Sequence, residues 1–271
     1  MPAITESTQH FAALAAVWSQ LQLPLRPREP VPTRLRAVLP KGVKDVLVLG
    51  VTPDYADIAP DVTALDWSEG MIAHVWPGDT ETRRAVQGDW RDMPFEDAQF
   101  DAVVGDNSLA FLPFPDQIGR AFAQVRRVLR PEGLAVFRMF LAPDQQPGDA
   151  DLVRFGRALK GRSSDALRWR VAMQAACEAA TPNVIADDGW RVFQRAFPDM
   201  ASLVEGNEWG ADEVRRLALF DGSTMALSFP TRAELARVAL QHFATLELLS
   251  SGSYLMAEDA PFVVMRGSAA G

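Results

Sequence analysis

Two apolar segments separated by a short turn constrain this chain more than any other feature. Residues 46–49 read Val-Leu-Val-Leu and run into Gly50, while a second apolar segment, 62–65, ends in Asp66. A strand that is apolar on both faces belongs inside a parallel sheet, and a glycine at its end lets backbone approach a ligand without a Cβ in the way. A carboxylate ending the neighbouring strand can accept hydrogen bonds from both hydroxyls of a ribose. The two strand ends therefore predict one crevice that holds a nucleoside.

Length and charge limit the classes of protein and of partner. The 271 residues, 48% of them hydrophobic, are enough for one elaborated α/β domain with an insertion. The formal charge of -8 disfavours a nucleic acid partner, because phosphate binding needs a basic face. A single cysteine and three histidines, none at metal-ligand spacing, predict a reducing setting and no metal site.

Targeting and membrane signals also bear on where the chain acts. The first residues lack the basic region of a signal peptide, and no run approaches about 18 apolar residues. We therefore expect a cytoplasmic protein without a membrane partner.

Apolar periodicity divides the chain into three parts. Helical spacing over residues 7–21 predicts an N-terminal cover helix, and apolar strands alternate with helical segments from residue 46 to residue 141. Strands are expected near 84–87, at 100–106 and at 134–141, with a helix over 118–129 between the last two. This alternation is typical of right-handed βαβ units in a parallel sheet.

The alternation then stops, and helical patterns take over. Helices are expected at 151–159, 164–180, 189–197 and 212–219, which together predict an all-helical cap over the carboxyl edge of the sheet. Thr231 is a suitable N-cap for a helix to residue 243, and strands at 245–249 and 262–266 would close the sheet as a hairpin. The expected parts are residues 1–142 (cover and core), 143–229 (cap) and 230–271 (last helix and strands).

Several motifs resemble those of class I S-adenosylmethionine-dependent methyltransferases, and they follow one another in the same order as in that family. The segment 88–101, Gly-Asp-Trp-Arg-Asp-Met-Pro-Phe-Glu-Asp-Ala-Gln-Phe-Asp, and the segment 128–134, Val-Leu-Arg-Pro-Glu-Gly-Leu, carry the resemblance together with the two strands above. It covers roughly residues 46–141. It implies a Rossmann-like, mostly parallel seven-stranded sheet with helices on both faces. It also implies S-adenosylmethionine as cofactor and S-adenosylhomocysteine as product.

The resemblance implies roles for residues along the methionyl and ribose parts of the cofactor. Gly50 and Thr52 would face the methionyl part, and Asp66 would take the ribose hydroxyls. Asp106 and Asn107 would lie below the sulfonium. The family usually carries two or three glycines in its first turn, whereas here Gly50 is followed by Val-Thr-Pro-Asp.

A second group of residues is implied around the adenine. Trp67 and Met71 would flank the ring, Asp89 would accept a hydrogen bond from its amino group, and Trp90 would stack or pack beside it. Asp66 and Asp89 could also be ordinary solvated acids at strand ends. The aromatic residues and Met71 could simply be packing residues.

Five further residues are candidates on physical grounds alone. Trp18 could cover the sulfonium, and Arg26 could bind the carboxylate of the cofactor, or it could be a surface charge. Phe111, Trp169 and Trp190 are candidates for the lining of a pocket for a small-molecule methyl acceptor, although helical spacing also fits the two tryptophans as core.

The expected chemistry needs no nucleophilic side chain. The methyl group of the cofactor is already activated, so proximity and desolvation suffice, and the sequence identifies no catalytic base. One alternative is a catalytically inactive relative that binds an adenosyl ligand or a protein partner. A nicotinamide-dependent dehydrogenase fits less well, because the turn after residue 49 lacks G-x-G-x-x-G. The helical insertion could enclose a substrate or form a homodimer.

Overall fold

A computed structural model describes residues 4–143 and 148–269 of the chain. Residues 1–3, 144–147 and 270–271, which fall within the three expected parts, lie outside the described residues. A seven-stranded sheet forms the centre of the molecule, with strand order β3-β2-β1-β4-β5-β9-β8. The Rossmann-like, mostly parallel sheet expected from the sequence is therefore confirmed.

The parallel part of the sheet consists of five strands, of which all but β3 are largely buried. They are β1 (Asp45–Leu49), β2 (Asp61–Asp66), β3 (Arg83–Gln87), β4 (Phe100–Asp106) and β5 (Leu129–Arg138). Leu49 at the end of β1 is in register with Leu65 on one side and Gly105 on the other. This register brings the carboxyl ends of β1, β2 and β4 to one edge of the sheet.

The expected terminal hairpin is present. β8 (Thr245–Leu249) and β9 (Phe262–Arg266) pair antiparallel, and β9 also pairs antiparallel with β5. The helix before them, α10 (Arg232–Ala239), begins at the expected N-cap, where the Thr231 hydroxyl and the Glu234 side chain form a capping box. It ends four residues earlier than expected.

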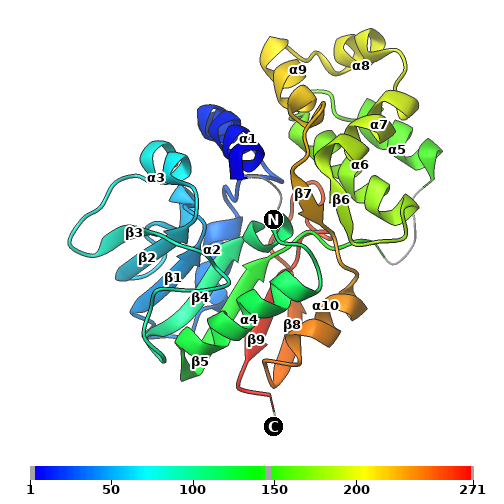
Figure 1. Ribbon diagram of the computed structural model, residues 1–271. Coiled ribbons are helices and arrows are strands. Elements are labelled where there is room, and N and C mark those ends of the chain that lie inside the picture. The colour runs from blue at the N-terminus through cyan, green and yellow to red at the C-terminus, as the bar shows by residue number, and fades with distance from the viewer. Residues whose placement is uncertain (1–3, 144–147, 270–271) are drawn as a thin grey trace.

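Helices cover both faces of the sheet (Figure 1). α4 (Asp116–Val128) and α10 share a buried apolar cluster with one face, and residues of α1 (Ile4–Val17), α2 (Val31–Val38) and α3 (Glu69–Val75) share another cluster with the opposite face. No helix was predicted from the sequence where α2 lies. Its Pro32 falls in the first turn, where the missing N–H has no intrahelical partner to lose.

The insertion after β5 forms a cap with its own apolar interior. It contains α5 (Asp149–Arg157), α6 (Asp165–Glu178), α7 (Ala186–Ala196), α8 (Met200–Asn207), α9 (Ala211–Leu217) and the short helix η4 (Ala218–Phe220). The expectation of an all-helical cap was wrong in one respect. β6 (Asn183–Ile185) and β7 (Ala226–Ser228) form a small antiparallel sheet, too short to show a period in the sequence.

Three connections hold the cap and the N-terminal segment at the carboxyl edge (Figure 1). The short helix η1 (Trp18–Gln20) follows α1, and the Gln20 side chain accepts a hydrogen bond from Arg216 of α9 at 3.1 Å. Arg170 of α6 pairs with Asp259 in the β8–β9 loop at 2.5 Å. Met256 of the same loop lies in the apolar interior of the cap.

Candidate functional site

The turn after β1 brings four structural elements together. Gly50 has φ +89°, a backbone conformation that side chains disfavour, and its N–H donates to the carbonyl of Leu65 at 2.8 Å. A Cβ placed on Gly50 would lie 3.9 Å from each of three groups, namely Asp66 Oδ2, Trp90 Cζ2 and Ser108 Cβ. The ends of β1 and β2, the loop after β3 and the short helix η3 (Ser108–Phe111) therefore meet at this glycine.

Asp66 is a buried carboxylate at the end of β2. Its Oδ2 accepts a hydrogen bond from the Val51 N–H at 3.1 Å, and its Oδ1 accepts one from the Ser68 N–H at 2.9 Å. Asp66 is only 5% exposed, and this burial raises the pKa of its carboxyl group to about 6. The hydrogen bonds from the backbone N–H groups oppose the rise. Each oxygen keeps one further lone pair, so the carboxylate can still accept two hydroxyl groups.

Aromatic rings surround this carboxylate. The Trp90 indole is buried and donates its Nε1–H to the Leu65 carbonyl at 2.7 Å. Phe11 of α1 packs edge-on against Trp67 and against Phe111, with ring centroids 5.0 Å and 5.3 Å apart. Met71 is buried in α3. Trp90 belongs to the apolar cluster on one face of the sheet, whereas Phe11, Trp67 and Met71 belong to the cluster on the other, so their roles around an adenine stay predictions. The helical spacing of Phe11 had indicated only packing.

Asp89 occupies a different environment from Asp66. Its carboxylate forms a two-point ion pair with Arg91, with Nη2–Oδ2 at 2.5 Å and Nε–Oδ1 at 2.8 Å, and it is 42% exposed. Hydrogen bonds from Arg91 lower the pKa of Asp89. The side chain is therefore charged and already partnered, and its role toward an adenine stays a prediction.

Arg138 is the one charged residue in the apolar second half of β5, residues 134–138. Its Nε donates to Asp106 Oδ1 at 2.5 Å and its Nη2 donates to Asp106 Oδ2 at 2.8 Å, with both side chains almost fully buried. The Tyr55 hydroxyl donates to the same carboxylate at 3.3 Å. Although burial opposes the charged form, Asp106 holds the pKa of Arg138 above its ordinary value. Three donors thus engage the Asp106 carboxylate.

Unpartnered polar atoms lie beside this pair at the end of β4. Asn107 Oδ1 and Ser108 Oγ are buried and have no hydrogen-bond partner within the described residues, and neither does Trp18 Nε1. Asn107 adopts the left-handed conformation, with φ 55°. Buried polar groups are normally hydrogen-bonded, so atoms left without partners next to the Gly50 turn fit a polar ligand. The residues present therefore fit an adenosyl cofactor.

Two other candidate residues, Thr52 and Arg26, lie near the glycine turn. Thr52 is buried and precedes the short helix η2 (Pro53–Tyr55), and its hydroxyl makes no capping hydrogen bond to that helix. Arg26 pairs with Asp54 of η2 at 2.7 Å. This pair places the guanidinium beside the turn, and a role in binding a carboxylate stays a prediction.

The cap tryptophans lie in the interior of the cap. Trp169 packs among the rings of Phe140, Phe220 and Phe229, and Trp190 stacks on Phe193 with a centroid distance of 4.9 Å. Both residues are buried. Their contacts correspond to the packing interpretation of their helical spacing.

Comparison with known proteins finds a methyltransferase domain in the first half of the chain. Residues 50–137 match the family model described as "Methyltransferase domain". Over 96 residues the chain is 33% identical to a malonyl-[acyl-carrier protein] O-methyltransferase from Geobacter sulfurreducens, an alignment that covers 35% of this chain and 34% of the relative. The alignment thus spans about a third of that relative's length.

Solved structures with low sequence identity share the fold over nearly the whole chain. A structure from Rhodobacter sphaeroides, assigned provisionally to the Zn-dependent alcohol dehydrogenases, has a TM-score of 0.61 at 15% identity, covering 98% of this chain and 100% of that one. A DhpI–SAH complex has a TM-score of 0.55 at 17% identity, covering 98% and 97%. At these identities the likeness concerns the fold alone.

The fold and the strand-end site define a nucleoside-binding α/β protein. The matched family model and the O-methyltransferase relative make the assignment specific. Residues 50–137 thus match a methyltransferase domain, in agreement with the resemblance to class I S-adenosylmethionine-dependent methyltransferases, whose cofactor is S-adenosylmethionine.

Two further findings concern membrane-spanning helices and metal-binding side chains. No helix within residues 4–143 and 148–269 has both the length and the apolar character needed to cross a membrane. Over the same residues, no three His, Cys, Asp or Glu side chains are grouped so that they could hold a metal ion.

Proposed function

We propose that this protein transfers the methyl group of S-adenosylmethionine to a small-molecule acceptor. One observation carries the proposal. A buried Asp66 carboxylate with free lone pairs lies beside the Gly50 turn, and the unpartnered atoms of Asn107 and Ser108 lie at the adjoining strand end. A nucleoside with a polar amino acid tail would supply partners for both sets of groups.

The residues of this chain would bind, orient and exclude water. Asp66 would hold the ribose, and Trp67, Met71 and Trp90 would enclose the adenine in an apolar slot. Asn107 would face the methionyl end. When bound, the cofactor supplies a methyl group already activated by its sulfonium, so the protein contributes mainly alignment and desolvation.

No catalytic base is needed for an acceptor that is already a nucleophile. Asp106 is a poor candidate for a base, because Arg138 and Tyr55 together donate three hydrogen bonds to its carboxylate. We therefore assign Asp106 to holding the end of β4 in position. An acceptor that reacts as an anion or as a neutral amine fits this arrangement.

A small acceptor is favoured over a macromolecule by the position of the cap. The Arg216–Gln20 hydrogen bond joins the cap to η1, and the Arg170–Asp259 ion pair joins it to the β8–β9 loop, so the cap would cover a small acceptor at the carboxyl edge. The net charge of -8 also argues against nucleic acid. The cytoplasmic location and the homodimer expected from the sequence stay predictions.

Two measurements test the proposal. Calorimetric titration with S-adenosylmethionine, S-adenosylhomocysteine and NAD should show binding of the two adenosyl ligands and not of NAD. Incubation with methyl-labelled S-adenosylmethionine and a metabolite extract should then label a small molecule. Adenosyl binding without any transfer would favour the catalytically inactive relative, and binding of NAD alone would contradict the proposal.

A further inference from the structure

A cleft lies where the N-terminal segment, the cap and the β8–β9 loop meet. We call it the junction cleft. Its volume is about 480 Å³, and its lining includes Leu23 and Arg28 from the N-terminal segment, Arg162 and Ser163 from the cap, and Tyr254 from the loop. Sites between separately folded layers are common places for small ligands. None of the sequence motifs pointed to this cleft.

The junction cleft carries more positive than negative charge. Arg162 is exposed and pairs with no carboxylate of the described residues. The Arg28 guanidinium donates only to the backbone carbonyls of Leu21 and Ser19, at 3.2 Å and 2.9 Å, so its charge is not neutralised by an acid. Glu29 is the one acidic residue in the lining. Two guanidinium groups and one carboxylate favour an anionic ligand.

The cap wall of the cleft is fixed by a buried network. Ser163 Oγ donates to Asp165 Oδ2 at 2.9 Å, and Arg168 pairs with Asp165 at 3.0 Å. Arg216 lies 3.5 Å from the same carboxylate and reaches Gln20 across the gap to η1. Because Asp165, Arg168 and Arg216 are buried, Arg162 is presented from a rigid wall.

Tyr254 connects the cleft to the strand-end site. Its hydroxyl accepts a hydrogen bond from Arg138 Nη1 at 3.0 Å, and Arg138 in turn holds Asp106 at the end of β4. Asn107, with its unpartnered oxygen, is the next residue. A ligand in the junction cleft is therefore linked to Asn107, which we assign to the cofactor site, through Tyr254, Arg138 and Asp106.

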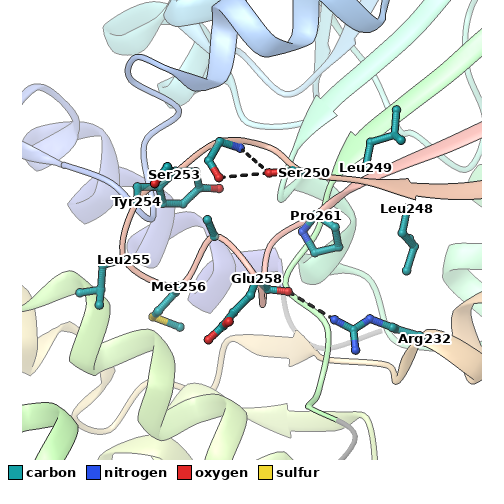
Figure 2. Close-up of a pocket in the computed structure, with 12 residues that line it drawn as sticks. Arg232, Leu248, Leu249, Ser250, Ser253, Tyr254, Leu255, Met256, Glu258 and Pro261 are labelled. Carbon is teal, nitrogen blue, oxygen red and sulfur yellow. Dashed lines mark hydrogen bonds between the residues drawn. The ribbon is translucent and has the colours of Figure 1, made fainter.

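A larger cavity on the same loop is less suitable. Figure 2 shows this cavity of about 660 Å³, where Tyr254 and Leu255 lie at one end and Leu248 and Leu249 of the edge strand β8 at the other. Its arginine, Arg232, donates to the Glu258 carbonyl at 3.4 Å. The cavity opens at the edge of the sheet, three strands from β4. Its lining carries one arginine and one glutamate, Arg232 and Glu258, so it lacks the excess of positive charge that the junction cleft has.

We propose that the junction cleft binds the methyl acceptor, and that this acceptor carries a carboxylate or a phosphate held by Arg162 and Arg28. The inference rests on the proposed methyltransferase function. The anionic group would lie at the rim, next to the arginines, and the rest of the molecule would extend past Tyr254 toward the end of β4. Arg162 would thus determine specificity without taking part in the transfer step.

The first test measures anion binding with defined probes. Titration of the full-length protein, with and without S-adenosylhomocysteine, would use benzoate, phenyl phosphate and the neutral isostere benzamide. We expect one of the two anions to bind at least tenfold more tightly than benzamide, which identifies the anion class. Arg162→Gln should weaken that binding about tenfold, whereas Arg157→Gln, an exposed arginine elsewhere in the cap, should not.

The second test follows the natural acceptor. Methyl label should enter the fraction of a metabolite extract that an anion exchanger retains, and phosphatase treatment beforehand would abolish labelling only for a phosphate acceptor. Arg162→Gln should raise KM for this fraction and leave kcat and S-adenosylhomocysteine affinity unchanged. Equal binding of anions and benzamide, or labelling confined to the unretained fraction, would overturn the inference. Loss of adenosyl binding by the unaltered protein would instead contradict the proposed function.

Discussion

Asp106 and Arg138 form a fully buried two-point ion pair that joins the ends of β4 and β5, with Nε–Oδ1 at 2.5 Å and Nη2–Oδ2 at 2.8 Å. The guanidinium also donates to the Tyr254 hydroxyl and to the Leu25 carbonyl, at 3.0 Å and 3.2 Å. One side chain thus links the sheet, the N-terminal segment and the β8–β9 loop directly below the candidate site.

Arg138→Met should strongly destabilise the protein. It would leave the Asp106 carboxylate buried without its cation, a change that costs about 3–5 kcal/mol in proteins. Urea unfolding would measure the loss. The double variant Asp106→Asn/Arg138→Met should lose less than the sum of the two single variants, because no buried charge remains. Additive losses would contradict the pairing.

Asp66 should make stability depend on pH in a defined window. Its pKa is about 6 in the folded chain and 3.8 as an ordinary aspartate, so the folded state holds the proton more tightly. The contribution of Asp66 to the free energy of unfolding is fully present below about pH 4. It falls by about 3 kcal/mol as the pH rises through about 6. The free energy of unfolding relative to Asp66→Asn should therefore decrease over this range. A difference that does not change with pH would refute the burial of the charge.

Asp66→Ala should weaken adenosyl binding without unfolding the protein. Removing a carboxylate that accepts two ribose hydroxyls costs one to a few kcal/mol, or about tenfold or more in affinity. Calorimetry with S-adenosylhomocysteine would measure the change. Asp61→Ala, at the exposed amino end of the same strand, is the matched control and should bind normally. Equal affinities for the two variants would remove Asp66 from the site.

Gly50→Ala separates backbone strain from ligand contact. A Cβ at this position meets only ordinary contacts at 3.9 Å, so the cost, about 1 kcal/mol, comes from the φ of +89°. Gly42→Ala, with φ +86° and open space around it, should lose similar stability. Only the Gly50 variant should also weaken S-adenosylhomocysteine binding, as measured by titration. An equal effect of both variants on binding would show that the turn does not contact the ligand.

The sheet was predictable because its local signals are strong. β1 and β4 are apolar on both faces, and a parallel sheet is the arrangement that buries such strands. The Thr231 and Glu234 capping box likewise marked the start of α10 in the sequence. In these elements the residues that decide the structure are close neighbours in the chain.

Features that depend on distant partners were missed. The charge of Arg138 could be recognised as unusual, but its partners Asp106 and Tyr254 lie far away in sequence. β6 and β7 are three residues each, and the helices α7, α8 and α9 separate them in the chain. Asp66 and Asp89 looked equivalent as strand-end acids, and only packing distinguishes the buried one from the one that is paired with Arg91.

The position of β9 has a consequence for biosynthesis. This strand follows the cap in the chain and lies between β5 and β8, so one hydrogen-bonding edge of β5 stays open while the whole cap is translated. An apolar edge of this kind can pair with other nascent chains. Correct folding in the cell therefore depends on how soon the β8–β9 hairpin is synthesised after the cap. The need for chaperones should be greatest while the cap is being synthesised.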